Sequence, residues 1–376
     1  MRKPNTELNP NKSENISEST SPPDIDVSVT SEEPNTSDGF IDYLKEAGTF
    51  ELPVSGASGY ANAPLSFREG PSLYAKIISR LKAGEGFTIL GELHDWWQIE
   101  LGGKIGWVMS KHCLINLPDV VPSIIYKNTN AYSSILVSSG KEIPNITGQQ
   151  LYNTYVYNKR FDKEGYLVPV SYVAALKIGV AQQAALAEGN TLIIYEAFRP
   201  YKVQQKIVEN LKTLANSDSE VRNGIIEPPW SMGWFIATGT SHHQKGYAID
   251  VSLGKVISQE TRSIGSYLYK ETIGYKEYSM PSKMHELSVK SIIFDYPVSF
   301  RSDTAWRDAS PSDTMNREAL LLQKYCTKAG FTPIASEWWH FNDMSGLKAA
   351  KKNAKSGRFF IDKNYSVIPI SMESSN

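Results

Sequence analysis

The sequence has few of the residues on which several classes of protein depend. Only two of its 376 residues are cysteines, Cys113 and Cys326, and they lie far apart in the chain. A disulfide framework and a thiolate zinc site both require clustered cysteines, so we expect neither. Export would be compatible with this scarcity but does not follow from it.

Long apolar runs and an excess of one charge are also missing. No stretch approaches the roughly 18 apolar residues that would suggest a membrane span. The basic N-terminus is not followed by an apolar segment, so the chain as written is expected to carry no signal peptide. The 39 basic and 40 acidic side chains give a formal net charge of -1. This balance gives no reason to expect nucleic acid or an anionic membrane as a partner.

The first 38 residues contain no aromatic side chain and are rich in Ser, Asn, Thr, Pro and Glu. Such a segment cannot bury enough apolar surface to offset its ordering entropy, so residues 1–38 are expected to form a disordered linker. The rest of the chain can bury a core, because 41% of all residues are hydrophobic. Its length predicts two or three domains.

Residues 55–120 have an all-β texture of short apolar runs separated by Gly, Pro, Asn and Asp. The segment LSFREGPS, followed by DWWQIEL and GKIGWVM, resembles bacterial Src-homology-3-like (SH3-like) domains. This resemblance implies a small barrel that binds peptidoglycan peptides or a partner protein. Trp96, Trp97 and Trp107 belong either to the barrel core or to a ligand groove. If the run is extended, the tandem pair Trp96 and Trp97 points to opposite faces, so one could be buried and the other exposed.

Residues 124–376 show a mixed pattern, which predicts an α+β domain with a small antiparallel sheet and flanking helices. Ser171 is a candidate N-cap and Gly189 a stop signal for a first helix. A buried strand is expected at 190–198, followed by a second helix, and a third helix at 314–329. The helical apolar spacing is carried by Val173, Leu176, Val180, Ala184 and Ala187 in the first helix and by Val203, Ile207, Leu211 and Leu214 in the second.

The segment SHHQKGYAID, residues 241–250, combines histidine and carboxylate at short spacing. Alternation along its strand places Asp250 on the face opposite Tyr247 and Ile249. Gly246 permits a turn just before the strand, which lets His243 fold back beside Asp250. A histidine and an aspartate held in this way supply two of the three protein ligands that a catalytic zinc ion needs.

The segment SEWWHF, residues 336–341, supplies the remaining groups. His340 is the natural third ligand, and Glu337 is placed to exchange protons with a metal-bound water. In a straight strand, residues three apart face opposite ways. The segment must therefore twist, bulge or become helical for Glu337 and His340 to reach one site, and the sequence leaves these alternatives open.

These motifs resemble those of zinc D-alanyl-D-alanine peptidases. SHHQKGYAID fits their Ser-x-His-x-x-Gly-x-Ala-x-Asp pattern and EWWH their Glu-x-Trp-His pattern. EAFRPY and NITGQQLY fit further segments of D-alanyl-D-alanine dipeptidase, the enzyme type behind vancomycin resistance. The resemblance spans about residues 124–345, with the motifs in the same order.

The resemblance implies one zinc ion per chain and a role for each matching residue. Glu337 would be the general acid/base, Arg199 would stabilise the oxyanion, and Ser241 would help to hold the polar ends of the substrate. The implied zinc ligands are His243, Asp250 and His340. Arg199 has a second interpretation, as a structural residue that ties the start of a helix to a strand.

The chain departs from the dipeptidase pattern at MPSKMHELS. His285, with Glu286 adjacent, stands where the family carries an acidic residue that anchors the free ammonium of the substrate. Unless Glu286 takes over, recognition of a free amino end is weakened. We expect His285 to pack in a loop or in the substrate pocket, and His242 to pack beside the site, without binding metal.

The leading hypothesis is a zinc metallopeptidase that hydrolyses D-alanyl-D-alanine or D-Ala-containing cell-wall peptides. The alternatives are a D,D- or L,D-carboxypeptidase acting on peptidoglycan stem peptides, and a non-catalytic wall-binding protein with a degenerate enzyme domain. Substrate length separates the first two, and the intact motif residues argue against the third. The SH3-like domain favours an extracytoplasmic or wall-associated location, and a cytoplasmic one stays open.

Overall fold

A computed structural model describes residues 39–349 and 356–369 of the protein. The predicted linker, residues 1–38, and most of a basic run at 348–355 lie outside the described residues. The chain divides into two units at residue 38, and everything below concerns the second unit. None of the described helices is both long enough and apolar enough to cross a bilayer.

The N-terminal part is rich in strands, as the close spacing of its turn residues predicts. Eight strands hydrogen-bond in the order β14–β8–β2–β5–β6–β7–β3–β4, and all neighbouring pairs are antiparallel. The strands are β2 (Ser58–Ala61), β3 (Leu65–Arg68), β4 (Ile77–Leu81), β5 (Gly86–Leu93), β6 (Trp96–Leu101), β7 (Lys104–Met109), β8 (Cys113–Asn116) and β14 (Pro169–Ser171).

This sheet differs from the predicted barrel in two ways. Among the described residues no pairing joins its end strands β14 and β4, so closure into a barrel is not found. In addition, β14 comes from the segment assigned to the second domain, and Ser171 pairs with Leu114 of β8. One sheet therefore bridges the predicted boundary between 55–120 and 124–376. We call residues 55–120 the SH3-like region.

The tandem tryptophans of β6 are both buried. Trp97 is fully buried and Trp96 is 9% exposed, so the split into one buried and one exposed ring that an extended run allows is not found. The Trp97 indole donates a hydrogen bond to Glu92 and lies edge-to-face on Tyr172, the first residue of α2, at 4.7 Å between ring centroids. Trp97 thus joins the SH3-like region to the second half of the chain.

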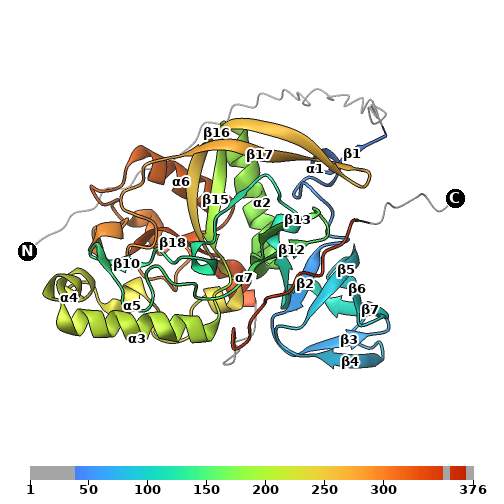
Figure 1. The fold of residues 1–376 in the computed structure, drawn as a ribbon, viewed down its shortest axis with the longest axis horizontal. Helices are drawn as coiled ribbons and strands as arrows, with labels where there is room; N and C mark the ends of the chain where they lie inside the picture. Colours follow the sequence, from blue (N-terminus) through green and yellow to red (C-terminus); the bar gives the residue numbers. More distant parts are fainter. Residues whose placement is uncertain (1–38, 350–355, 370–376) are drawn as a thin grey trace, which may run out of the picture. The chain divides into compact units, whose positions relative to one another are not determined.

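The second sheet is mixed, whereas a purely antiparallel one was predicted. Its path is β1–β17–β16–β15–β9, with β19 paired to β16 and β18 to β19. The central pairs are antiparallel, but β1 with β17 and β15 with β9 are parallel. The strands are β1 (Ile41–Asp42), β9 (Ile125–Tyr126), β15 (Asn190–Glu196), β16 (Ala248–Ile264), β17 (Tyr267–Glu277), β18 (Thr332–Ile334) and β19 (Glu337–Asn342). The long β16–β17 hairpin is prominent in Figure 1.

The predicted helices are present, with one boundary displaced. The first begins after Ser171, whose hydroxyl accepts from the backbone of Ala174, and Gly189 follows its end with a φ of 75°. The third begins at Arg317 instead of 314, because the Asn316 side chain caps it. The helices are α1 (Tyr43–Ala47), α2 (Tyr172–Ala187), α3 (Tyr201–Ser217), α4 (Ser219–Ile226), α5 (Met232–Phe235), α6 (Arg317–Lys328) and α7 (Met344–Ala349).

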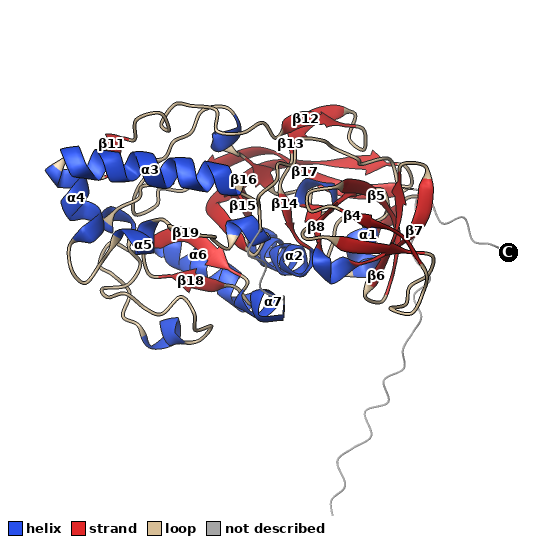
Figure 2. Ribbon diagram, turned by 90° about the horizontal axis from the view of Figure 1, so that it is seen from below, coloured by secondary structure: helices blue, strands red, loops and turns tan. Residues whose placement is uncertain are grey.

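Short elements complete the fold. Two small hairpins, β10 (Val137–Ser138) with β11 (Lys141–Glu142) and β12 (Tyr155–Asn158) with β13 (Lys163–Tyr166), lie outside the two main sheets. In Figure 2, helices α5 and α6 lie around β18 and β19, whereas β4–β8 form a region of mostly strand. The 3-10 turns are η1 (Ser110–His112), η2 (Leu117–Asp119), η3 (Thr129–Ala131), η4 (His243–Lys245), η5 (Val289–Ser291) and η6 (Ala305–Asp308).

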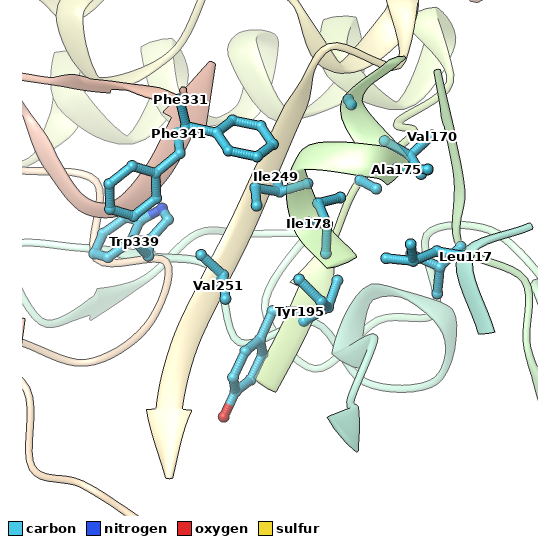
Figure 3. Packing of buried hydrophobic residues seen from close by; sticks show 14 of the residues in the cluster. Leu117, Val170, Ala175, Ile178, Tyr195, Ile249, Val251, Phe331, Trp339 and Phe341 are labelled. Atoms are coloured by element: carbon cyan, nitrogen blue, oxygen red, sulfur yellow. The ribbon is translucent and has the colours of Figure 1, made fainter. Parts of the chain in front are cut away.

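One apolar core runs through both sheets. A single cluster of buried side chains extends from Trp97 in the SH3-like region to Trp339 in β19. Figure 3 shows part of it, with side chains from α2 (Ile178), β14 (Val170) and β16 (Ile249). The two cysteines, Cys113 and Cys326, are both buried and free. Because the cluster is continuous, the strands that carry the candidate site pack against the same core as the SH3-like region.

A buried carboxyl group lies where the chain passes between the two regions. Glu51 is 5% exposed, and both the backbone N–H and the hydroxyl of Ser123 donate to it. Gln182 of α2 donates in turn to the Ser123 hydroxyl. Burial outweighs these hydrogen bonds and raises the pKa of Glu51 to about 7.

The raised pKa of Glu51 predicts a loss of stability as pH rises. The folded protein holds this proton up to about pH 7, whereas the unfolded chain releases it near 4.5. Glu51 therefore makes its full contribution to the free energy of unfolding below pH 4.5. This contribution decreases by about 3 kcal/mol between pH 4.5 and pH 7. A Glu51→Gln variant keeps the neutral shape, so its stability advantage over the wild type should grow by about this amount across the window.

Urea denaturation of both proteins at several pH values measures this difference. Glu46→Gln is the matched control, because Glu46 is exposed on α1. The difference in unfolding free energy between Glu46→Gln and the wild type should not change with pH. If the difference in unfolding free energy between Glu51→Gln and the wild type is also independent of pH, the prediction is wrong.

Candidate functional site

Three neighbouring strands place charged or ionisable side chains side by side. In the register of the sheet, Asp250 of β16 lies opposite Glu196 of β15 on one side and opposite His340 of β19 on the other. All three side chains are buried. A row of polar residues across the middle of a buried sheet is costly unless the groups are paired or bind an ion.

His243 joins this row from the turn before β16. The turn is the 3-10 segment η4, and it ends at Gly246 in the left-handed conformation, with a φ of 72°. The turn expected at Gly246 is therefore present. It brings His243 Nε2 to 3.4 Å from Asp250 Oδ1 and 3.2 Å from His340 Nδ1. His340 Nδ1 lies 3.0 Å from Asp250 Oδ1.

The structure thus brings together the three residues expected from the sequence to bind metal, and they form a group that could hold a metal ion. The other nitrogen of each ring faces an acceptor: His243 Nδ1 lies 2.6 Å from the carbonyl of Ala197, and His340 Nε2 lies 3.0 Å from Asn342 Oδ1. In the tautomer that donates its N–H there, each neutral ring would present a lone pair toward Asp250, as metal binding requires; without an ion the same nitrogens can donate to the Asp250 carboxylate instead. Two lone pairs and a carboxylate oxygen that face one another fit a cation.

Asp250 uses its second oxygen to contact two further groups. Oδ2 lies 3.3 Å from Arg199 Nη2 and 3.2 Å from His285 Nε2. Burial opposes ionisation of Asp250, but the surrounding imidazoles outweigh it and hold the pKa of the carboxyl well below its usual range. Burial lowers the pKa of His340, which favours the neutral ring that a metal ligand requires.

A bulge in β19 brings Glu337 to the same site as His340. β18 pairs Pro333 with Phe341 but its next residue, Ile334, with Glu337, so residues 338–340 have no partner on that side. Glu337 Oε2 consequently lies 3.7 Å from His340 Nδ1. The bulge resolves how two residues three apart in a strand reach one site. Burial and the nearby charge of Asp250 raise the pKa of Glu337 well above its usual value.

Arg199 is held by an acidic partner that the sequence interpretation did not single out. Its Nε and Nη2 both donate to Glu196, and Nη1 donates to Gln204 at 2.8 Å. Glu196 also accepts from Tyr152 and Asn130. With the contact to Asp250, four of the five guanidinium N–H groups are engaged within the described part of the chain, and one on Nη1 remains for a ligand.

Ser241 and His242 lie at the edge of the site. The Ser241 hydroxyl accepts from the backbone N–H of His243 at 3.2 Å, so it also stabilises the turn. His242 Nδ1 lies 2.7 Å from Asn342 Oδ1, and burial lowers the pKa of this ring to about 4. His242 is not a member of the metal-type groups among the described residues.

The predicted metal ligands line one cavity of about 310 Å³, together with Glu337, Arg199 and Ser241. Apolar walls come from α5, from Trp339 and from Phe300, whose ring lies edge-to-face on Trp234 of α5 at 5.8 Å between centroids. Asp250 and Glu337 are the only carboxylates among the described residues that line it. The cavity therefore offers a carboxylate to an ion or a proton at the site, but no separate carboxylate to a substrate ammonium.

The MPSKMHELS segment places its two candidate residues differently. His285 lines the cavity, in the left-handed region with a φ of 62°. Glu286 is buried outside the cavity lining, and its carboxylate accepts from the backbone N–H groups of Ser139 at 2.6 Å and Gly140 at 2.9 Å. Glu286 is thus committed to holding a loop.

Two site residues went unnoticed in the sequence. Glu196 lies three residues before Arg199 at the end of a buried strand, and its charge was a signal that could have been used. Asn342, two residues after His340, carried no comparable signal, because its role depends on the two imidazoles that meet at its oxygen.

Comparison with known families agrees with the motifs. Residues 63–114 match the bacterial SH3 domain, and residues 170–305 match the D-alanyl-D-alanine carboxypeptidase family. The chain therefore carries an SH3-like domain followed by a domain of this peptidase family. The second match includes His243 and Asp250 and ends before His340, which reaches the site through β19. A search of curated proteins gives no match.

The turn that carries His243 should not tolerate a side chain at Gly246. A Cβ there would lie 2.4 Å from Leu114 Cδ2 and 2.9 Å from the backbone nitrogen of Ser171, at a φ of +72°. We expect Gly246→Ala to lower the free energy of unfolding by about 2 kcal/mol or more, measured by urea denaturation. The matched control is Gly165→Ala on β13, where nothing lies within 4 Å. Equal effects of the two substitutions would contradict the tight fit at Gly246.

Proposed function

We propose that the protein is a zinc-dependent D,D-peptidase that removes the terminal D-alanine from peptidoglycan peptides ending in D-Ala-D-Ala. The observation that carries the proposal is the convergence of three buried acceptor atoms, from His243, Asp250 and His340, beside Glu337 and Arg199 in one cavity. The match of residues 170–305 to D-alanyl-D-alanine carboxypeptidases supports a hydrolase that acts on such peptides.

His243, Asp250 and His340 would hold one zinc ion. Their facing atoms are 3.0, 3.2 and 3.4 Å apart. In a tetrahedral zinc site with bonds of about 2.0–2.1 Å, ligand atoms lie about 3.3–3.4 Å from one another, so the group needs little adjustment. When bound, zinc supplies a water of lowered pKa and polarises the substrate carbonyl.

Glu337 is proposed as the general acid/base. Its carboxylate lies beside the ligand group and lines the cavity. It takes a proton from the water that attacks the peptide carbonyl and delivers it to the nitrogen of the departing D-alanine. The C–N bond breaks, and a new carboxylate and a free amine result.

Arg199 and Ser241 would bind the substrate. Arg199 lines the cavity and keeps one N–H beyond its four contacts, which can stabilise the developing negative charge on the carbonyl oxygen. Ser241 lines the same cavity and can bind a polar end of the peptide. The salt bridge from Arg199 to buried Glu196 fixes the guanidinium in advance, so little reorganisation is needed during the reaction.

The charges around the cavity favour a carboxypeptidase over a dipeptidase. A free dipeptide carries an ammonium group next to the bond to be cut, and a buried ammonium needs a carboxylate partner. Glu286 is committed to backbone N–H groups, and His285 offers an imidazole instead. In a stem peptide this amine is acylated and uncharged. We therefore propose stem peptides, in place of free D-Ala-D-Ala, as the substrate class.

The SH3-like region supports a role at the cell wall. Bacterial SH3 domains suggest wall association, and residues 63–114 match that family. Tyr74 in the β3–β4 connection is 99% exposed and is available to a ligand. We propose that this region keeps the enzyme on peptidoglycan.

Replacing Glu337 should stop turnover while the metal stays bound. For Glu337→Gln and Glu337→Ala we expect kcat on a D-Ala-D-Ala-ended peptide to fall by at least about 100-fold, because the proton carrier is lost. Zinc content, measured by atomic absorption after dialysis, should stay near one per chain. Glu227→Gln, an exposed carboxylate at the end of α4, is the matched control. A near-normal kcat in Glu337→Gln would contradict the role of Glu337 as general acid/base. Loss of zinc from this variant would instead indicate that Glu337 is a metal ligand.

Blocking the amine of the substrate should increase the rate. We expect kcat/KM for a diacetyl-L-lysyl-D-Ala-D-Ala peptide to exceed that for free D-Ala-D-Ala by at least about tenfold, the cost of one unpaired charged group. Released D-alanine, measured by mass spectrometry, reports both reactions. The same peptide ending in L-Ala-L-Ala tests stereochemistry. A higher kcat/KM for the free dipeptide would make the protein a dipeptidase.

A further inference from the structure

The turn that carries His243 is contacted from outside the peptidase domain. Asn62, just after β2 in the SH3-like region, donates from its side-chain amide to the carbonyl of Lys245 at 2.8 Å. The backbone N–H of Asn62 itself donates to the carbonyl of His112 at 3.0 Å, which anchors the residue to η1. Lys245 is the last residue of η4, two residues after His243.

The same turn fits closely against strands of the shared sheet. Gly246 leaves no room for a Cβ beside Leu114 of β8, and its carbonyl accepts from the backbone N–H of Ser171 in β14 at 2.8 Å. The two SH3-like contacts, from Asn62 and Leu114, thus lie on consecutive residues of the turn.

The C-terminal segment also fits closely against the turn. A Cβ on Gly357 would lie 2.6 Å from Cβ of Gln244, the residue after His243. Farther along, the segment follows the SH3-like region, where the Tyr365 carbonyl accepts from Thr88 at 2.6 Å and Val367 N–H donates to the carbonyl of Gly56 at 2.8 Å. One continuous segment therefore touches both the turn and the SH3-like sheet.

We propose that the SH3-like region is part of the scaffold of the metal site, with Asn62 as a positioning residue that fixes the turn of His243. This inference rests on the metal site of the proposed function. The hydrogen bond from Asn62 holds the end of η4, while the Ala197 carbonyl holds the imidazole at Nδ1. With both ends fixed, Nε2 is held toward Asp250 before any ion arrives, which lowers the cost of binding.

The test measures zinc affinity of the full chain, without substrate. Metal-free wild type, Asn62→Ala and Asn62→Asp are titrated with zinc in competition with a chromophoric chelator. We expect Asn62→Ala to weaken zinc binding by about fivefold, the worth of one hydrogen bond of this kind. Asn62→Asp keeps the size of the side chain, but its carboxylate cannot donate to the Lys245 carbonyl, so its loss of affinity should be at least as large.

Ser79→Ala is the matched control. Ser79 is exposed on β4, at the far end of the same sheet. Removal of its hydroxyl group should change zinc affinity by less than about twofold. Cobalt-loaded protein gives a second readout, because its visible absorption reports ligand geometry. The Asn62 variants should show a shifted cobalt spectrum, and the control should not. If Asn62→Ala fails to fold, the zinc affinity and cobalt spectrum of Asn62→Asp provide the test of the positioning role.

The outcomes separate this inference from the proposed function. If both Asn62 variants lose only thermal stability, with unchanged zinc affinity and cobalt spectrum, the positioning role is overturned even when the wild type cleaves stem peptides. If zinc affinity falls as expected but no peptide is cleaved by any protein, the inference stands and the proposed peptidase function falls. A wild type that binds no zinc overturns both.

Discussion

Charge neutrality around Asp250 is the constraint on which the rest of the site depends. Three buried carboxylates, Asp250, Glu196 and Glu337, lie close to one guanidinium, that of Arg199. If all are ionised, the balance is three negative charges against one positive, an excess of two. A divalent cation would remove this excess. Burial, together with the nearby charge of Asp250, raises the pKa of Glu337 and so drives this carboxyl toward its neutral form, which reduces the same excess.

The fold meets this constraint with rigid elements. Asp250 and its neighbours Glu196 and His340 stand on adjacent strands, so the sheet itself sets their spacing. Arg199 comes from the loop between β15 and α3, directly after the strand that carries its partner Glu196. Among the three predicted metal ligands only His243 comes from a turn, and that turn is packed against strands, a side-chain amide and the C-terminal segment. The least regular of the three ligand positions is thus held by contacts from the SH3-like region and the C-terminal segment.

Sequence reasoning predicted the parts of the site that depend on local spacing. His243, Gly246 and Asp250 lie within eight residues, and the left-handed glycine dictates the fold-back that the structure shows. For EWWH the sequence left a twist, a bulge and a helical turn open, and it could not select the bulge, because the bulge arises from pairing with β18 and not from the segment itself. The parallel edge pairs and the open SH3-like sheet were missed for the same reason, since both are decided by which distant strand lies alongside.

The pairing of β14 with β8 also limits how this protein can be recombined. A graft that exchanged residues 55–120 for another wall-binding cassette would strip β14 of its neighbour and uncover Val170, which is fully buried. The new cassette would need a strand edge of matching register and a residue able to take the place of Leu114 against Gly246. Substitutions on either side of the β14–β8 contact must therefore compensate one another, so the two regions cannot be exchanged as independent modules without redesign of this contact.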